Sequence, residues 1–187
     1  PPTTRLAHLA GTETLMIPAE RLCVRPARVD DLDILTTFSA AMAWETEQRR
    51  LDVTRLRQGT QAVIDRPERG QFYVTELRQE PPADTVIVGQ LLITYEWSDW
   101  RNAQFWWIQS VYVTPHWRRH GVYRAMHRTI VELARSRTDV CGIRLYVEGD
   151  NAIAKQVYER VGLFSSTYRI YESDFVLPGH HAHGQKP

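Results

Sequence analysis

The sequence feature that most constrains the fold is a strand-like segment followed by a short loop and a helix-like segment. Residues 105–113 (FWWIQSVYV) are rich in aromatic and β-branched side chains, which predicts a buried strand that ends before Pro115. From Val122 onward apolar residues recur at helical spacing, which predicts a helix. The side chains expected on its buried face are Val122, Ala125, Met126, Ile130, Leu133 and Ala134.

The loop between these two segments is basic and contains one glycine. It reads PHWRRHGVY over residues 115–123, and Arg118, Arg119 and Arg124 provide positive charge. The first amides of a helix, and the positive end of its dipole, favour an anion placed above the preceding strand. Gly121 would let the backbone approach such a ligand closely. The pattern predicts a site for a phosphorylated ligand.

A second strand and helix follow immediately. Residues 142–148 (GIRLYVE) alternate as in a strand, and residues 149–151 (GDN) are a turn and helix-cap signal. Residues 152–161 then have helical spacing, and Gly162 ends the helix. The succession predicts a βαβ unit whose helix crosses over between two parallel strands.

Two motifs in this region resemble the GNAT superfamily of N-acetyltransferases. Residues 111–123 are similar to its acetyl-CoA loop, Q/R-x-x-G-x-G/A: Arg118 and Gly121 match the first two fixed positions, whereas Tyr123 replaces the usual small residue. Residues 145–164 are similar to its second signature, strand-Asn-x-x-Ala-x-x-x-Tyr-x-x-x-Gly-Phe, with Leu163 inserted before the phenylalanine. The loop motif alone could arise by chance, but both motifs in this order are specific.

The resemblance covers roughly residues 20–172 and implies an α/β fold of GNAT type. Such a fold has a mixed, mostly antiparallel sheet that is splayed at its centre and flanked by helices. We therefore expect an N-terminal extension over residues 1–19, an acetyltransferase domain over residues 20–177 and a flexible polar tail over residues 178–187. Three histidines in that tail could bind metal, but a flexible tail is the preferred interpretation: His180, His181 and His183.

The rest of the chain supplies further elements. Residues 20–25 are expected to form a first strand, and Asp30 begins a helix that buries Leu32, Leu35 and Phe38. The other expected elements are a helix over 53–64 and strands over 70–77, 86–97 and 167–172. An edge strand near the C-terminus is compatible with a homodimer.

Composition excludes several other classes. The 187 residues carry a net charge of +1, which provides no overall attraction to nucleic acid or to an anionic membrane. No apolar run approaches the length of a membrane span. Cys23 and Cys141 form neither a metal pattern nor a disulfide scaffold, so no metal is expected and a reduced, cytoplasmic setting is the default.

The resemblance also implies roles in binding acetyl-CoA, the expected co-substrate. Amides from Arg119 to Tyr123 would hold the diphosphate. Backbone groups at Val111, Tyr112 and Val113 would pair with the pantetheine arm and supply an oxyanion donor. Asn151 matches a residue that bonds the pantetheine and is also a plausible N-cap. The complete expected set is Val111, Tyr112, Val113, Arg118, Arg119, His120, Gly121, Val122, Tyr123, Arg124 and Asn151.

The resemblance to the GNAT superfamily also implies catalytic roles. Tyr158 matches the proton donor to the departing thiolate. Glu96, near the end of a strand, is a candidate base that acts directly or through water, and Glu47 and Glu148 are rivals. Trp107 stands near the strand position where some relatives carry an acidic base, which favours a water relay. Glu45 and Glu47 are candidates for binding a cationic amine, although a solvated helix end is the simpler interpretation.

The predicted activity is acetyl-CoA-dependent acetylation of a primary amine on a small molecule or a protein. Because no cysteine occupies a convincing nucleophile position, direct transfer is expected. An alternative is a non-catalytic CoA-binding sensor or subunit. A third hypothesis, nucleic-acid binding through basic residues 118–128, ranks last because the total charge is near neutral.

Overall fold

The computed structural model describes residues 16–79, 84–171 and 173–177. The chain divides into two compact units, Pro1–Gly149 and Asp150–Pro187, and each is described by itself. The described strands of the first unit are β1 (Leu22–Pro26), β2 (Gln71–Leu77), β3 (Val86–Ser98), β4 (Ala103–Val113) and β5 (Val140–Leu145). Its described α-helices are α1 (Leu32–Glu47), α2 (Val53–Asp65) and α3 (Val122–Arg135), and the second unit contains α4 (Ala152–Arg160).

The five strands form one mixed sheet in the order β1-β2-β3-β4-β5. Neighbours from β1 to β4 are antiparallel, whereas β4 and β5 are parallel. Parallel strands need a crossover connection, and α3 provides it. The predicted fold class is therefore confirmed: an antiparallel meander leads into one parallel pair.

The parallel pair separates partway along β4. Pairing with β5 runs from Gln104 to Ile108, where Ile108 lies opposite Leu145. β4 continues to Val113, which remains paired with β3. Backbone groups of residues 109–113 therefore lie outside the β4–β5 ladder, and the sheet is splayed at this point.

A β-bulge marks the place where the strands part. On β4, Ser110 pairs with Leu92 and Ile108 pairs with Ile93. Gln109 is therefore an extra residue that has no paired residue on β3. A bulge bends its strand and increases the local twist. This bend accounts for the divergence of the last part of β4 from β5.

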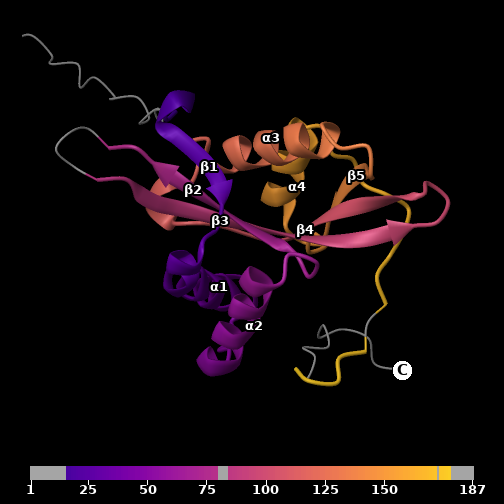
Figure 1. The fold of residues 1–187 in the computed structure, drawn as a ribbon, viewed down its shortest axis with the longest axis horizontal. Coiled ribbons are helices and arrows are strands. Elements are labelled where there is room, and N and C mark those ends of the chain that lie inside the picture. Colours follow the sequence, from indigo (N-terminus) through magenta and orange to yellow (C-terminus); the bar gives the residue numbers. More distant parts are fainter. Residues whose placement is uncertain (1–15, 80–83, 172, 178–187) are drawn as a thin grey trace, which may run out of the picture. The chain divides into compact units, whose positions relative to one another are not determined.

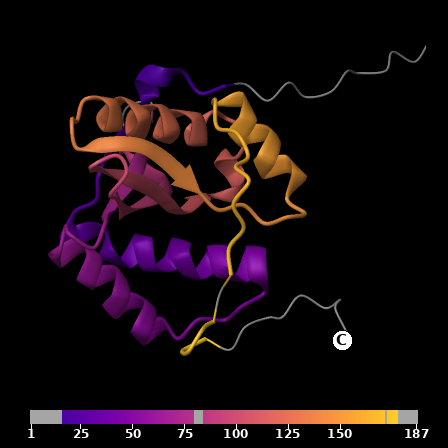
Figure 2. The same ribbon diagram turned by 90° about the vertical axis from the view of Figure 1, so that its right-hand side faces the viewer.

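Helices cover both faces of the sheet in the first unit. α1 and α2 lie on one face and α3 lies on the other (Figures 1 and 2). Because strand side chains alternate between faces, Tyr73 joins the core beneath α3, whereas Phe72 and Val74 pack with Leu35 of α1. The larger core is the one beneath α3.

The buried face of α3 follows a four-residue spacing. Val122, Met126, Ile130 and Ala134 are all buried, as predicted. Leu133, which was also expected in the core, is 39% exposed, so that prediction was wrong. A four-residue row winds around the helix because one turn takes 3.6 residues. By the last turn the row has therefore moved away from position 133.

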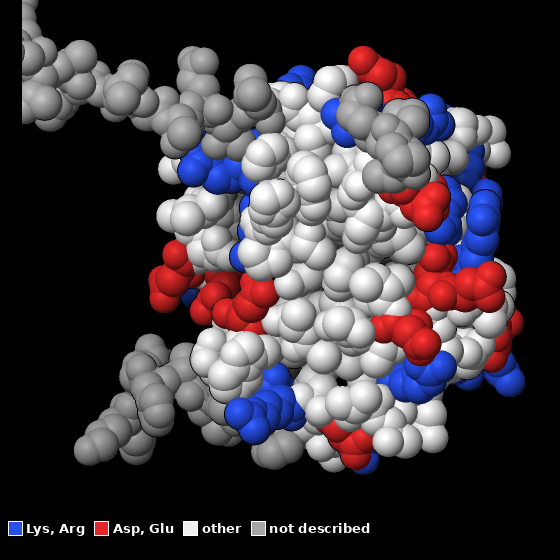
Figure 3. Space-filling model, turned by 90° about the vertical axis from the view of Figure 1, so that its left-hand side faces the viewer, with Lys and Arg blue, Asp and Glu red and all other residues white. Residues whose placement is uncertain are grey.

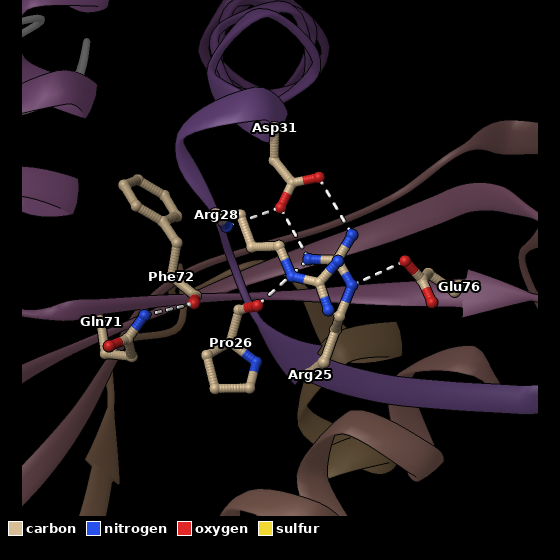
Figure 4. Close-up of polar contacts among 7 residues, drawn as sticks. All are labelled: Arg25, Pro26, Arg28, Asp31, Gln71, Phe72 and Glu76. Atoms are coloured by element: carbon tan, nitrogen blue, oxygen red, sulfur yellow. Dashed lines mark hydrogen bonds and ion pairs between the residues drawn. The ribbon is translucent and has the colours of Figure 1, made fainter.

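A partly buried ion-pair network joins the first strand to the first helix (Figure 4). The Arg25 guanidinium donates from Nη1 and Nη2 to Asp31, at 2.7 and 3.1 Å, and from Nε to Glu76 of β2 at 2.6 Å. The Arg28 amide also donates to Asp31 at 2.7 Å. Burial by itself would raise the pKa of Asp31, but these hydrogen bonds outweigh it and lower the pKa. The network fixes the direction in which the chain enters α1.

Two strand predictions need correction. β5 ends at Leu145, so residues 146–148 are not part of it. Their expected partner is missing because β4 has already diverged. Within the described residues after α4, the predicted strand over 167–172 is not formed, and Tyr168 and Tyr171 are 79% and 94% exposed. Alternation of side chains does not produce a strand without a ladder partner.

Three other sequence-based expectations concern the C-terminal histidines, membrane-spanning segments and the edges of the sheet. The histidines at 180, 181 and 183 lie outside the described residues. Among the helices that are described, none combines the length and the apolar character needed to cross a membrane. The sheet edges are β1 and β5, so the C-terminal edge strand that suggested a dimer is not seen in the described part of the chain.

Candidate active site

The loop between β4 and α3 has an unusual backbone path. Arg119 and Gly121 both have positive φ values, 68° and 92°. Gly121 is the N-cap of α3, and within the described residues no side chain caps this helix start. Successive amides in a turn that contains left-handed residues can point toward one side and form a concavity suited to an anion. The start of α3 therefore has no side-chain cap among the described residues, and its first amides are candidates for holding an anion.

The two residues after the glycine point into the protein. Val122 is buried at 2% exposure, and the Tyr123 ring packs against the core beneath α3, 5.9 Å from the His127 ring. A tyrosine at this position could crowd a diphosphate if its side chain faced the loop. Because it packs against the core, its size does not by itself block the helix start.

The segment before β1 lies against this loop. The Ile17 amide donates to the His120 carbonyl at 3.1 Å. A Cβ atom built on Gly121 would lie only 2.6 Å from Cε of Met16. Gly121 is therefore required both by its φ value and by the closeness of this segment.

Arg118 is held by an ion-pair cluster that reaches across to α1. Its guanidinium donates to Glu45 near the end of α1, and its Nε donates to the Val113 carbonyl at 2.9 Å. The Tyr112 hydroxyl donates to the other oxygen of Glu45 at 2.9 Å. The Arg118 guanidinium also lies 5.5 Å from the centre of the Tyr112 ring. We call Glu45, Tyr112 and Arg118 the Glu45 cluster.

This cluster affects the ionisation of its members. Burial alone would raise the pKa of Glu45, but hydrogen bonds from Arg118 and Tyr112 and the charge of Arg118 together lower it. The pKa of Tyr112 is raised, first by burial and then by its bond to the Glu45 carboxylate. Near neutral pH, Glu45 is therefore ionised and Tyr112 is protonated.

A second cluster lies where β4 and β5 are still paired. The Glu96 carboxylate accepts hydrogen bonds from the Trp107 indole and, at 2.8 Å, from Arg144 of β5. Tyr146 stacks on Trp107 with ring centres 4.3 Å apart. Arg144 also lies 3.6 Å from the centre of the Phe105 ring. We call Glu96, Trp107, Arg144 and Tyr146 the Glu96 cluster.

The other acidic candidates are placed differently. The Glu47 side chain is 60% exposed, and its carboxylate lies 3.6 Å from Nε of Arg49. Glu148 is exposed and follows the end of β5. Neither belongs to the Glu45 or the Glu96 cluster.

Asn151 and Tyr158 belong to the second compact unit. Oδ1 of Asn151 accepts the Ala154 amide at 2.9 Å, so Asn151 caps α4 as its sequence position predicts. Tyr158 lies in α4, and burial raises the pKa of its hydroxyl above the ordinary value. The hydroxyl therefore remains protonated at neutral pH and can act as a proton donor.

Three expected cofactor-binding residues are brought together with an acidic residue of α1. Two of them, Tyr112 and Arg118, belong to the Glu45 cluster. The third, Val113, accepts a hydrogen bond from Arg118 through its carbonyl. Glu45 was expected from the sequence only as a substrate-binding candidate, and its pairing with Arg118, 73 residues away, was not predicted. Arg144 and Tyr146 were missed, although period-two alternation places them on the same side of the chain.

Surface charge is distributed in small groups. On the face shown in Figure 3, acidic and basic side chains gather in separate groups around a largely uncharged middle. A nucleic-acid-binding face would carry a continuous basic stripe. This face carries no continuous basic stripe among its described residues.

Comparison with known proteins identifies the relatives of the chain. The family model described as acetyltransferase (GNAT) family matches residues 34–163. A possible acetyltransferase from Clostridium difficile 630 is 36% identical with a TM-score of 0.74, and the match covers 83% of this chain and 99% of that one. A comparison with curated proteins gave no significant match.

More distant structures share the fold. An integron cassette protein from the mobile metagenome of Cole Harbour Salt Marsh is 17% identical, with a TM-score of 0.69 and coverage of 86% of this chain and 93% of that chain. The aminoglycoside N-acetyltransferase AAC(6')-Iy, solved in complex with CoA, is 11% identical, with a TM-score of 0.64 and coverage of 83% and 95%.

Proposed function

Because this chain belongs to the GNAT acetyltransferase family, we propose that it transfers an acetyl group from acetyl-CoA to a primary amine of a small molecule or protein. One observation carries the proposal: β4 parts from β5 after Ile108, just before an uncapped helix start at Gly121. This combination offers free backbone groups for an amide-containing arm and open amides for a diphosphate. An aminoglycoside acetyltransferase of similar fold, solved with CoA, supports the same ligand.

In this proposal the cofactor-binding residues act mainly through their backbone. Amides of residues 119–123 hold the diphosphate, with charge support from the arginines of the loop and of the first turn of α3. Backbone groups of residues 111–113 pair with the pantetheine and donate to the oxyanion. Asn151 adds a side-chain contact to the pantetheine.

The reaction requires one proton to leave the amine and one to reach the thiolate. The neutral amine nitrogen attacks the thioester carbonyl, a C–N bond forms, and the C–S bond breaks with its electron pair going to sulfur. Tyr158 gives its proton to that sulfur, and a carboxylate takes the proton released by the amine. Direct transfer needs no protein nucleophile.

Glu96 is the base that we propose, with Glu47 as the rival. Both oxygens of Glu96 already accept hydrogen bonds, from Trp107 and Arg144, but a carboxylate has four lone-pair positions. A water held on a remaining lone pair can relay the proton. Glu47 is the exposed last residue of α1, and its carboxylate lies 3.6 Å from Nε of Arg49.

Replacing Tyr158 with Phe tests the proposed proton donor. We expect turnover to fall by about 10²–10³-fold, while the dissociation constant of CoA changes by less than about twofold. Tyr171→Phe is a matched control because Tyr171 lies in the same unit and is 94% exposed. Calorimetry and a thiol-release assay measure the two quantities. Unchanged turnover in Tyr158→Phe would remove Tyr158 from the mechanism.

A non-catalytic CoA-binding role is the second candidate. The observation that favours it is the engagement of the Glu96 carboxylate by Trp107 and Arg144, which lowers its availability as a base. A wild-type protein that binds CoA but acetylates none of a broad panel of amines would support this role. Failure to bind CoA would contradict both candidates.

A further inference from the structure

The C-terminal end of α1 carries negative charge where a helix least tolerates it. Its last turn contains Glu45 and Glu47 and no basic residue. The carbonyl end of a helix dipole is itself negative, so each carboxylate there is disfavoured by roughly 0.3–1 kcal/mol at the surface. A helix end of this kind needs cations from elsewhere.

Arg118 supplies one of these cations to Glu45. It comes from the loop before α3, and the two side chains are 44% and 35% exposed. The Tyr112 hydroxyl occupies the other Glu45 oxygen. Glu45 is therefore ionised, half-exposed and held by a loop residue that lies three positions before the helix cap Gly121.

Arg118 therefore has two candidate partners. If the open amides at the start of α3 hold a diphosphate, its negative charge competes with Glu45 for the same guanidinium. The diphosphate carries two negative charges against one on the carboxylate, and its oxygens can accept bidentate hydrogen bonds from arginine. Movement of Arg118 toward the phosphates would leave the Glu45 carboxylate without its cation.

We propose that Glu45 anchors a positive charge of the acceptor, and that Arg118 occupies this anchor until acetyl-CoA is bound. The inference rests on the proposed function. The attacking nitrogen must be neutral, so the charge held by Glu45 is a second one on the same molecule. The acceptor is therefore an amine with at least one additional ammonium group, and it binds after the cofactor.

Kinetics with matched amines test the anchor. Spermidine carries additional ammonium groups, whereas n-butylamine carries only the amine to be acetylated. We expect Glu45→Gln to lower kcat/KM for spermidine by about tenfold or more, with less than about a twofold change for n-butylamine. Glu45→Asp, which keeps the charge, should restore part of the preference. Equal loss for both amines, or no loss for either, would overturn the proposal.

Binding measurements test whether Arg118 exchanges Glu45 for the diphosphate of the cofactor. Without Glu45 to hold it, Arg118 is available to the cofactor, so Glu45→Gln should bind CoA about two- to fivefold more tightly in calorimetry. In wild-type protein, spermidine should bind more tightly when CoA is present. In Arg118→Gln, spermidine should bind without CoA, because the anchor is already exposed.

The control is Asp139→Asn, which removes a carboxylate from an exposed pair with Arg137 outside both clusters. It should leave CoA affinity and amine preference as in the wild type. Tight CoA binding with no effect of Glu45→Gln beyond this control would refute the inference but leave the proposed function intact. Absence of CoA binding to the wild-type protein would instead refute the proposed function.

Discussion

At the scale of single residues, position 121 requires both a left-handed backbone and the absence of a Cβ atom, and only glycine satisfies both requirements. Its φ of 92° lies in the left-handed region, and a Cβ there would come within 2.6 Å of Met16. Arg119, at φ 68°, satisfies only the backbone requirement and tolerates a side chain. The glycine of the loop motif is therefore explained by backbone geometry and by the chain segment packed on it.

Gly121→Ala should both destabilise the protein and weaken CoA binding. The left-handed conformation costs an L-residue about 1–2 kcal/mol, and relief of that strain would reorient the amides at the helix start. Urea unfolding and CoA calorimetry measure the two effects. The control is Gly59→Ala within α2, where an added Cβ meets nothing within 4 Å. It should stabilise the protein by about 0.5–1 kcal/mol. Wild-type CoA affinity in Gly121→Ala would mean that the loop backbone does not bind the diphosphate.

At the scale of elements, the Arg25–Asp31–Glu76 network determines how β1 leads into α1. Asp31 and Arg25 have side-chain exposures of 7% and 16%, so removal of one partner leaves a poorly solvated charge. The pair between Arg57 and Asp33 also joins two elements, but its side chains are 49% and 82% exposed. Burial, and not the number of bonds, decides which pair matters for stability.

We therefore expect Asp31→Asn to lower the free energy of unfolding by about 3 kcal/mol. The control Asp33→Asn should lower it by less than about 1 kcal/mol. Chemical denaturation at neutral pH measures both. Similar values for the two variants would show that the network contributes no more than a surface ion pair.

The same network predicts a dependence of stability on pH. The folded-state pKa of Asp31 is lowered below the unfolded value of about 3.9, so its contribution is complete above that pH. The contribution is lost as pH falls through the folded-state pKa. In denaturation series between pH 7 and pH 3, the difference between wild type and Asp31→Asn should shrink only at the acidic end. A constant difference throughout would contradict this assignment.

The strands and helices also show which structural features a local sequence pattern can predict and which it cannot. The spacing of Met126 and Ile130 identified α3, and the aromatic run identified β4, because each pattern reports burial against a neighbour along its whole length. Tyr146 alternates correctly with Arg144 but lies beyond β5, since the bulge at Gln109 has turned β4 away. A local pattern does not reveal whether a partner strand is present.

At the scale of the whole molecule, binding should be coupled to stability. A ligand that binds only the folded state raises the free energy of unfolding by RT ln(1 + [L]/Kd), about 2.7 kcal/mol at a concentration of 100 Kd. CoA should therefore raise the melting temperature in a concentration-dependent manner. ADP, which lacks the pantetheine arm, should raise it less at equal concentration. Equal shifts for CoA and ADP would mean that the splay between β4 and β5 does not bind the arm.

The sequence by itself determined the order of the helices and of strands β1 to β5, the basic glycine loop and the family, because these depend on short-range spacing and on residue type. Only the tertiary structure decided that Tyr123 faces the core, that the ladder ends at Ile108 and that Arg118 is bound to Glu45. Those facts depend on which distant segments meet, and contacts between residues far apart in the chain leave no periodic signal in a single sequence.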